Sequence, residues 1–167
     1  YDDMLNRIDD DSLPVDESSV LVLRNAGSKA VPGMPEWGMI PIPKKLRKTG
    51  VVDMLRISDA RMSGTSFGTV ILHITPEAAI GGPLAFVQNG DQISFNAVKQ
   101  ELTFEITEEE LSRRKALWQP PVSKYRRGYP QLYIREVLGA DEGCDLDFLK
   151  PKNDDDLIFI EPVVGRS

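Results

Sequence analysis

The sequence predicts a mixed α/β domain built around a β-barrel-like sheet with flanking helices. The 167-residue chain is 41% hydrophobic, which is enough apolar material for one ordinary core. Its short apolar runs give more strands than helices, without the regular strand–helix alternation of a doubly wound sheet. Its 13 glycines and 12 prolines indicate many turns and argue against a bundle of long helices.

Apolar spacing and turn residues place the elements along the chain. Helices are expected over 2–8, 41–48, 107–118 and 130–138. Strands are expected over 20–23, 51–57, 69–74, 92–95 and 101–106, the last two forming a hairpin-like pair. In the helix over 107–118, Thr107 and Glu110 have the spacing of a capping box, in which each side chain satisfies a free backbone N–H. That helix should end near Trp118, before two consecutive prolines.

Charge and cysteine content exclude several classes of protein. The net charge of −6 gives no general basic footprint for nucleic acid, and no apolar run approaches the roughly 20 residues that cross a bilayer. The single Cys144 excludes an internal disulfide framework or a multi-cysteine cluster within the chain. We therefore expect a cytoplasmic protein, or one of an organellar matrix, with no nucleic-acid or membrane partner. Because the chain begins at Tyr1, we also expect it to be a piece of a longer protein.

Two glycine-containing segments are candidates for chemistry. Glu36 lies between Gly33 and Gly38, so its loop can approach a metal or a substrate closely, although most such carboxylates are simply solvated. The stretch 59–66 directly follows an apolar strand and carries several hydroxyl groups. An ordinary Ser/Thr/Gly turn explains this stretch equally well, and no histidine near it in sequence supports a Ser–His pair. His73 is expected to be a hydrogen-bonded residue of the core or its boundary.

Five motifs occur in order along the chain, and together they are far more specific than any one of them. They are Pro32-Gly33-Met34-Pro35-Glu36, Ile57-Ser58-Asp59-Ala60-Arg61-Met62-Ser63-Gly64-Thr65, His73-Ile74-Thr75-Pro76-Glu77-Ala78, Gly81-Gly82-Pro83-Leu84-Ala85 and Asn89-Gly90-Asp91. This series resembles the C-terminal domain of the dihydroxy-acid and sugar-acid (aldonate) dehydratase family. Details that look like the sugar-acid branch are Glu36-Trp37-Gly38, residues 41–46, residues 56–62 and residues 140–145.

The resemblance implies a swivelling domain over residues 1–150. The composition of residues 151–167 predicts an acidic, flexible tail. The resemblance further implies a hydro-lyase that converts a 2,3-dihydroxy sugar acid into a 2-keto-3-deoxy acid. Ser63 matches the base that takes the C2 proton, with Thr65 supporting the site, and Glu36 matches a magnesium ligand. Asp59 and Arg61 are given supporting roles.

The resemblance also assigns the iron–sulfur cluster and the other Mg²⁺ ligands to a large N-terminal domain that this chain lacks. We therefore expect the chain to need that domain as its partner, to be inactive alone, and to belong to a homo-oligomer in the parent protein. The alternatives are a dihydroxy-acid dehydratase of branched-chain amino-acid synthesis, a non-catalytic binding or interaction module with this fold, and a serine-dependent hydrolase. Where the family more often has proline at position 28 and glycine at 30 or 31, this chain has Ser28, Ala30 and Val31, whose extra Cβ atoms are expected to reshape the pocket.

Overall fold

The computed structural model of the chain describes residues 2–33, 36–62 and 66–150. The helices are α1 (Asp2–Arg7), α2 (Lys44–Lys48), α3 (Glu108–Leu117) and α4 (Gly128–Glu136), with the short 3₁₀ helices η1 (Ala78–Ile80), η2 (Pro83–Phe86), η3 (Ala140–Glu142) and η4 (Asp147–Leu149). The strands are β1 (Leu21–Leu23), β2 (Arg56–Ser58), β3 (Val70–Ile71), β4 (Gln92–Asn96) and β5 (Glu101–Glu105). The predicted mixed α/β class is confirmed.

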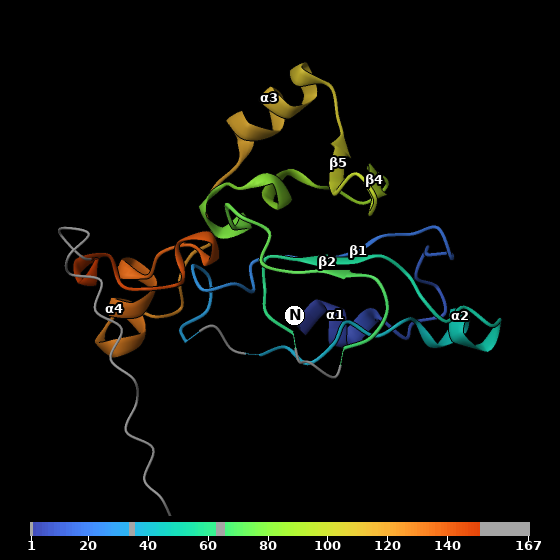
Figure 1. The fold of residues 1–167 in the computed structure, drawn as a ribbon, viewed down its shortest axis with the longest axis horizontal. Coiled ribbons are helices and arrows are strands. Elements are labelled where there is room, and N and C mark those ends of the chain that lie inside the picture. The colour runs from blue at the N-terminus through green and yellow to red at the C-terminus, as the bar shows by residue number, and fades with distance from the viewer. Residues whose placement is uncertain (1, 34–35, 63–65, 151–167) are drawn as a thin grey trace, which may run out of the picture.

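The strands form two separate small sheets (Figure 1). Three parallel strands lie in the order β1-β2-β3, and β2 is the central one. Strands β4 and β5 form the predicted antiparallel hairpin, in which Phe95 lies opposite Leu102. Within the described ranges neither sheet closes on itself, so the barrel-like closure expected from the sequence is not seen there. Because β1 has three residues and β3 has two, the parallel sheet offers only short edges for further pairing.

Each face of the parallel sheet packs into its own apolar cluster. Leu23 belongs to one cluster, which also receives Met4 of α1. Ile57 of β2 belongs to the other, together with residues of η1, η2 and the hairpin. This division follows from the strand period of two, which sends neighbouring side chains to opposite faces. Figure 1 shows the result, with α1 on one side of β1 and β2 and the hairpin with α3 on the other.

Helix α3 begins as predicted, but only half of its capping box forms. The Thr107 hydroxyl accepts a hydrogen bond from the Glu110 N–H at 3.3 Å. The Glu110 carboxylate does not return to the cap and instead accepts from Arg113 and Arg114, whose hydrogen bonds lower the pKa of Glu110 to about 2. Arg114 also donates to the Phe86 carbonyl at 2.8 Å and pairs with Asp91, which ties α3 to η2 and to the hairpin turn.

Several sequence predictions need correction. Strands expected over 51–57 and 69–74 shrink to three and two paired residues, because a parallel ladder extends only as far as its neighbour. His73 lies beyond β3, is exposed and has a φ of 53°, so it is neither in a strand nor in the core. None of the helices in the described part of the chain is long and apolar enough to cross a bilayer.

Candidate functional site

The loop that carries Glu36 and the segment that follows β2 run side by side. Glu36 and Arg61 form an isolated parallel β-bridge, and the Trp37 N–H donates to the Arg61 carbonyl at 3.1 Å. Further along, the Ser66 hydroxyl donates to the Gly38 carbonyl at 3.0 Å. Two motifs about 25 residues apart in sequence are therefore joined by backbone contacts at the carboxyl end of the parallel sheet, where ligand sites of such sheets commonly lie.

Ser63 and Thr65 lie outside the described residues, so their predicted roles stay predictions. The residues on either side of them are well anchored. Met62 is buried against Leu23, Ala26 and Ile40, and Ser66 is held by Gly38 as described above.

Asp59 is fully buried and holds the turn that follows β1. Its carboxylate accepts hydrogen bonds from the backbone N–H groups of Asn25 at 3.0 Å and of Ala26 at 3.2 Å. It also accepts from the Ala78 N–H at 3.0 Å, at the start of η1. A buried carboxylate is tolerated when several donors satisfy it, as here. Asp59 thus joins three segments beneath the loop of Glu36, and its contacts are all with backbone.

Glu36 and Arg61 both point a charged side chain into solvent, since both residues are exposed. An exposed carboxylate suits Mg²⁺, which keeps several waters and needs few protein ligands. Among the residues that the structure describes, no group of three or more His, Cys, Asp and Glu side chains is close enough to hold a metal ion. The Glu36 carboxylate therefore fits as one of the few protein ligands that a Mg²⁺ ion takes.

The residues of this chain do not fit an iron–sulfur cluster. Such clusters need several cysteine thiolates, and Cys144 is the one cysteine of the sequence. Its thiol is half-buried, and its Sγ lies 3.8 Å from the Ser28 hydroxyl. Burial, more than its acidic neighbours, raises the pKa of Cys144 and keeps the thiol protonated.

A second buried carboxylate, Glu77, is part of a conspicuous motif, but sequence reasoning gave it no role. It is 1% exposed and accepts from the Ser28 hydroxyl at 2.7 Å and from the Lys29 N–H at 2.8 Å. Ser28 therefore points into the core, and the expectation that the Cβ atoms of Ser28, Ala30 and Val31 reshape the pocket stays a prediction. In the sequence, Glu77 stands between Pro76 and two small apolar residues, Ala78 and Ala79, and this apolar setting was the signal that its side chain is buried.

The raised pKa of Glu77 predicts that the free energy of unfolding depends on pH. Burial raises its pKa in the folded chain, so the folded state holds this proton more tightly than the unfolded state. The stabilisation from this proton is complete below the ordinary value of 4.5 and is lost as the pH rises through the raised folded pKa. The free energy of unfolding of wild type minus that of Glu77→Gln should therefore fall as the pH rises above 4.5. Urea unfolding of both proteins across this range measures the difference, and a difference independent of pH would contradict the prediction.

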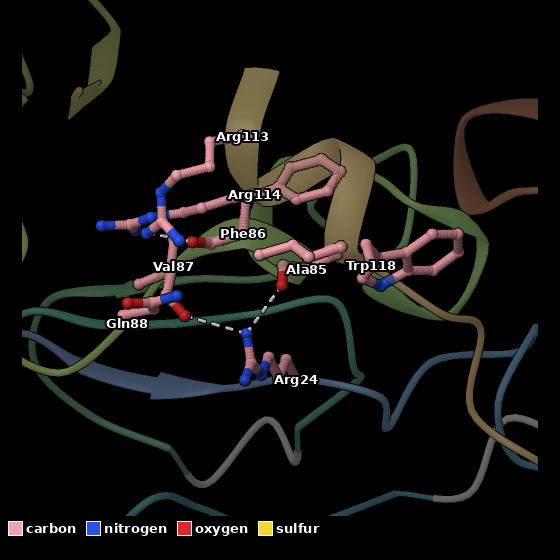
Figure 2. Close-up of a pocket in the computed structure, with 9 residues that line it drawn as sticks. Arg24, Ala85, Phe86, Val87, Gln88, Arg113, Arg114 and Trp118 are labelled. Carbon is pink, nitrogen blue, oxygen red and sulfur yellow. Dashed lines mark hydrogen bonds between the residues drawn. The ribbon is translucent and has the colours of Figure 1, made fainter. Parts of the chain in front are cut away.

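A shallow cavity of about 190 Å³ lies apart from these loops (Figure 2). Phe86, Arg114 and Trp118 are among its lining residues, and none of the predicted site residues is. Arg24, at its floor, donates through one nitrogen to the carbonyls of Ala85 and Val87, both at 2.9 Å. These bonds fasten η2 to the end of β1, which gives Arg24 a structural role.

Comparisons with known proteins place the chain in a family. The family described as "Dihydroxy-acid/6-phosphogluconate dehydratase C-terminal" matches residues 1–144. An L-arabinonate dehydratase of Rhizobium leguminosarum bv. trifolii is 52% identical over 149 residues, which are 89% of this chain and 26% of that protein. A 6-deoxy-6-sulfo-D-gluconate dehydratase of Pseudomonas putida is 49% identical, covering 90% of this chain and 26% of that protein.

A dihydroxy-acid dehydratase of Acinetobacter baylyi is 43% identical over 133 residues, which are 80% of this chain and 24% of that protein. The chain thus spans about a quarter of the length of these relatives. The match to the family covers most of the chain, and it confirms the resemblance predicted from the five motifs. This chain belongs to the dihydroxy-acid/6-phosphogluconate dehydratase family and corresponds to its C-terminal region.

Proposed function

We propose that this chain is the C-terminal part of a hydro-lyase that removes water from a 2,3-dihydroxy sugar acid. We call the parent protein the full-length dehydratase. On this enzyme the substrate loses its C2 proton and its C3 hydroxyl group, which leave together as one water molecule. The resulting enol then tautomerises to a 2-keto-3-deoxy acid. The observation that carries the proposal is the identity of 52% and 49% to relatives named for sugar acids, against 43% for one named for dihydroxy acids.

In this proposal Ser63 takes the C2 proton, and Thr65 supports it. Glu36 would be one ligand of a Mg²⁺ ion, and when bound this ion would lower the pKa of a nearby hydroxyl group, which a Ser–His pair otherwise does with its histidine. The contacts between the Glu36 loop and residues 61 and 66 support this pairing, since they bring the flanks of the Ser63 segment to the metal ligand. Asp59 supports the turn that follows β1, and Arg61 lies beside Glu36 in the β-bridge.

The proposal divides the enzyme between two domains. Residues 1–150 form the swivelling domain, whose small parallel sheet is completed to a barrel-like sheet by the rest of the protein. The iron–sulfur cluster and the other Mg²⁺ ligands come from the N-terminal domain, and the full-length dehydratase is a homo-oligomer. Residues 151–167 are proposed to be an acidic tail outside this domain, in keeping with their composition.

The test is an assay for 2-keto acids with a panel of aldonic acids and with 2,3-dihydroxy-isovalerate. The full-length dehydratase should turn over at least one aldonic acid faster than 2,3-dihydroxy-isovalerate, and the 167-residue chain alone should form no product. Faster turnover of 2,3-dihydroxy-isovalerate would favour the branched-chain alternative, which the 43% identical relative keeps open. Turnover by the chain alone would contradict the division of the site between two domains.

A further inference from the structure

Arg56 is a cationic side chain buried in the middle of the parallel sheet. It is the first residue of β2, and its side chain is 0% exposed. Burying a charge costs several kcal/mol unless its donors find acceptors, so a buried arginine needs a structural explanation. In the sequence it is one residue of the 56–62 pattern, and neither the motifs nor the proposed reaction gives it a role.

The guanidinium group of Arg56 connects backbone segments that are distant in sequence. Its Nη1 donates to the Ile40 carbonyl at 3.0 Å, and its Nη2 donates to the Phe67 carbonyl. Its Nε donates to the Met54 carbonyl at 3.2 Å, within its own strand segment. The Phe67 ring lies 5.6 Å from the guanidinium carbon, which adds a cation–π contact. The ion pair with Asp53, at 3.3 Å to a carboxylate that is 40% exposed, is the loosest of these contacts.

The Ile40 and Phe67 carbonyls belong to the two stretches that flank the proposed site. Ile40 ends the loop that begins at Glu36, and Phe67 follows Ser66. At the other end, the same stretches are joined by the Trp37–Arg61 hydrogen bond described above. The two stretches are therefore connected at two places: by the β-bridge between Glu36 and Arg61, and by Arg56, which binds the carbonyls of Ile40 and Phe67.

The shape of the guanidinium group explains why arginine occupies this position. Its planar fork presents five N–H donors in fixed directions, so one group can bind carbonyls on separate segments. Lysine carries its three donors on a single nitrogen and keeps the charge without this reach. Replacing Arg56 by lysine thus keeps the positive charge and removes the ability to bind carbonyls on two separate segments.

We propose that Arg56 is a positioning residue that sets the spacing between the Glu36 loop and the stretch Ser66–Phe67. One consequence rests on the proposed function: the spacing would align Glu36, the proposed metal ligand, with Ser63, the proposed base. The inference assigns Arg56 no contact with substrate.

The test compares Arg56→Lys with Asp53→Asn in the full-length dehydratase. Asp53→Asn removes the charge that pairs with Arg56 and leaves the bonds from Arg56 to Ile40 and Phe67 in place, so it is the control for the ion pair. It also weakens the hydrogen bonds that Thr69 donates to the Asp53 carboxylate. In Arg56→Lys, kcat at saturating substrate and Mg²⁺ should fall at least about tenfold, because small misplacements of reacting groups are costly. Amide hydrogen exchange, read from peptides over 36–40 and 66–70, should become faster. Asp53→Asn should keep kcat within about twofold and leave the exchange over 36–40 unchanged, even where its Tm falls and the Thr69 amide, which donates to Asp53, exchanges faster.

An Arg56→Lys variant with a lower Tm but wild-type kcat and wild-type exchange over 36–40 and 66–70 would overturn the proposal and leave Arg56 a stabilising residue only. Arg56→Gln, which can reach a single carbonyl, provides a second variant if Arg56→Lys does not fold. If wild type dehydrates none of the acids, the proposed function fails, while the exchange comparison still decides whether Arg56 orders the two stretches.

Discussion

Ser63→Ala in the full-length dehydratase is expected to lower kcat by about 10³-fold or more, with the fold intact. A positioned general base contributes roughly 10²- to 10⁴-fold to the rate. The apparent KM should change little, because the serine acts on the proton and not in binding. Initial rates of 2-keto acid formation, with a thermal melt as the folding check, measure both effects.

Ser66 provides the matched control for Ser63. Its hydroxyl donates to the Gly38 carbonyl and so is engaged in holding the loop. Ser66→Ala should therefore cost a small factor in kcat, about tenfold at most, from looser packing of the two stretches. Residual activity of Ser63→Ala near that of wild type would remove Ser63 from the reaction, and a larger loss in Ser66→Ala than in Ser63→Ala would move the base to Ser66.

Local signals in the sequence predicted most of the elements. The helix at Asp2–Arg7 and the hairpin of β4 and β5 follow from short-range periodicity, and both form as expected. Helix α3 begins at its predicted cap and ends before the paired prolines. The lengths of β2 and β3 could not be predicted, because they depend on strands whose paired residues lie 14 to 35 positions away in the chain. The same limit applies to closure of the sheet.

The candidate site was only partly predictable, and the reason is again long-range contact. Motif order indicated Glu36 and the segment after β2, and the structure brings these two stretches together. Glu77 and Arg56 could not be assigned roles from sequence, since a charged residue usually indicates a surface position. Their partners lie 48 to 49 and 11 to 16 residues away, and only the folded chain shows that the donors and acceptors match.

Gly27→Ala is expected to lower the free energy of unfolding by about 3 kcal/mol or more. Gly27 lies between the two buried carboxylates that hold the turn after β1. A Cβ atom on it would lie 2.5 Å from the Asp59 carbonyl oxygen and 2.6 Å from the carboxyl carbon of Glu77. Neither neighbour can move freely, because backbone holds the first and two hydrogen bonds hold the second. Urea unfolding of wild type and variant measures the loss.

Gly50→Ala separates crowding from backbone strain. Gly50 has a φ of 95°, and no atom lies within 4 Å of the place that an alanine methyl group would take, whereas Gly27 has no such positive φ. Gly50→Ala should therefore cost about 1 kcal/mol, from the left-handed backbone alone. If Gly27→Ala cost no more than Gly50→Ala, the turn would have room to relax around the methyl group. In that case Asp59 and Glu77 would not fix the turn after β1. The Ala26 carbonyl of this turn accepts a hydrogen bond from the Trp37 indole N–H at 2.7 Å, so the position of Trp37 in the Glu36 loop would not be fixed either.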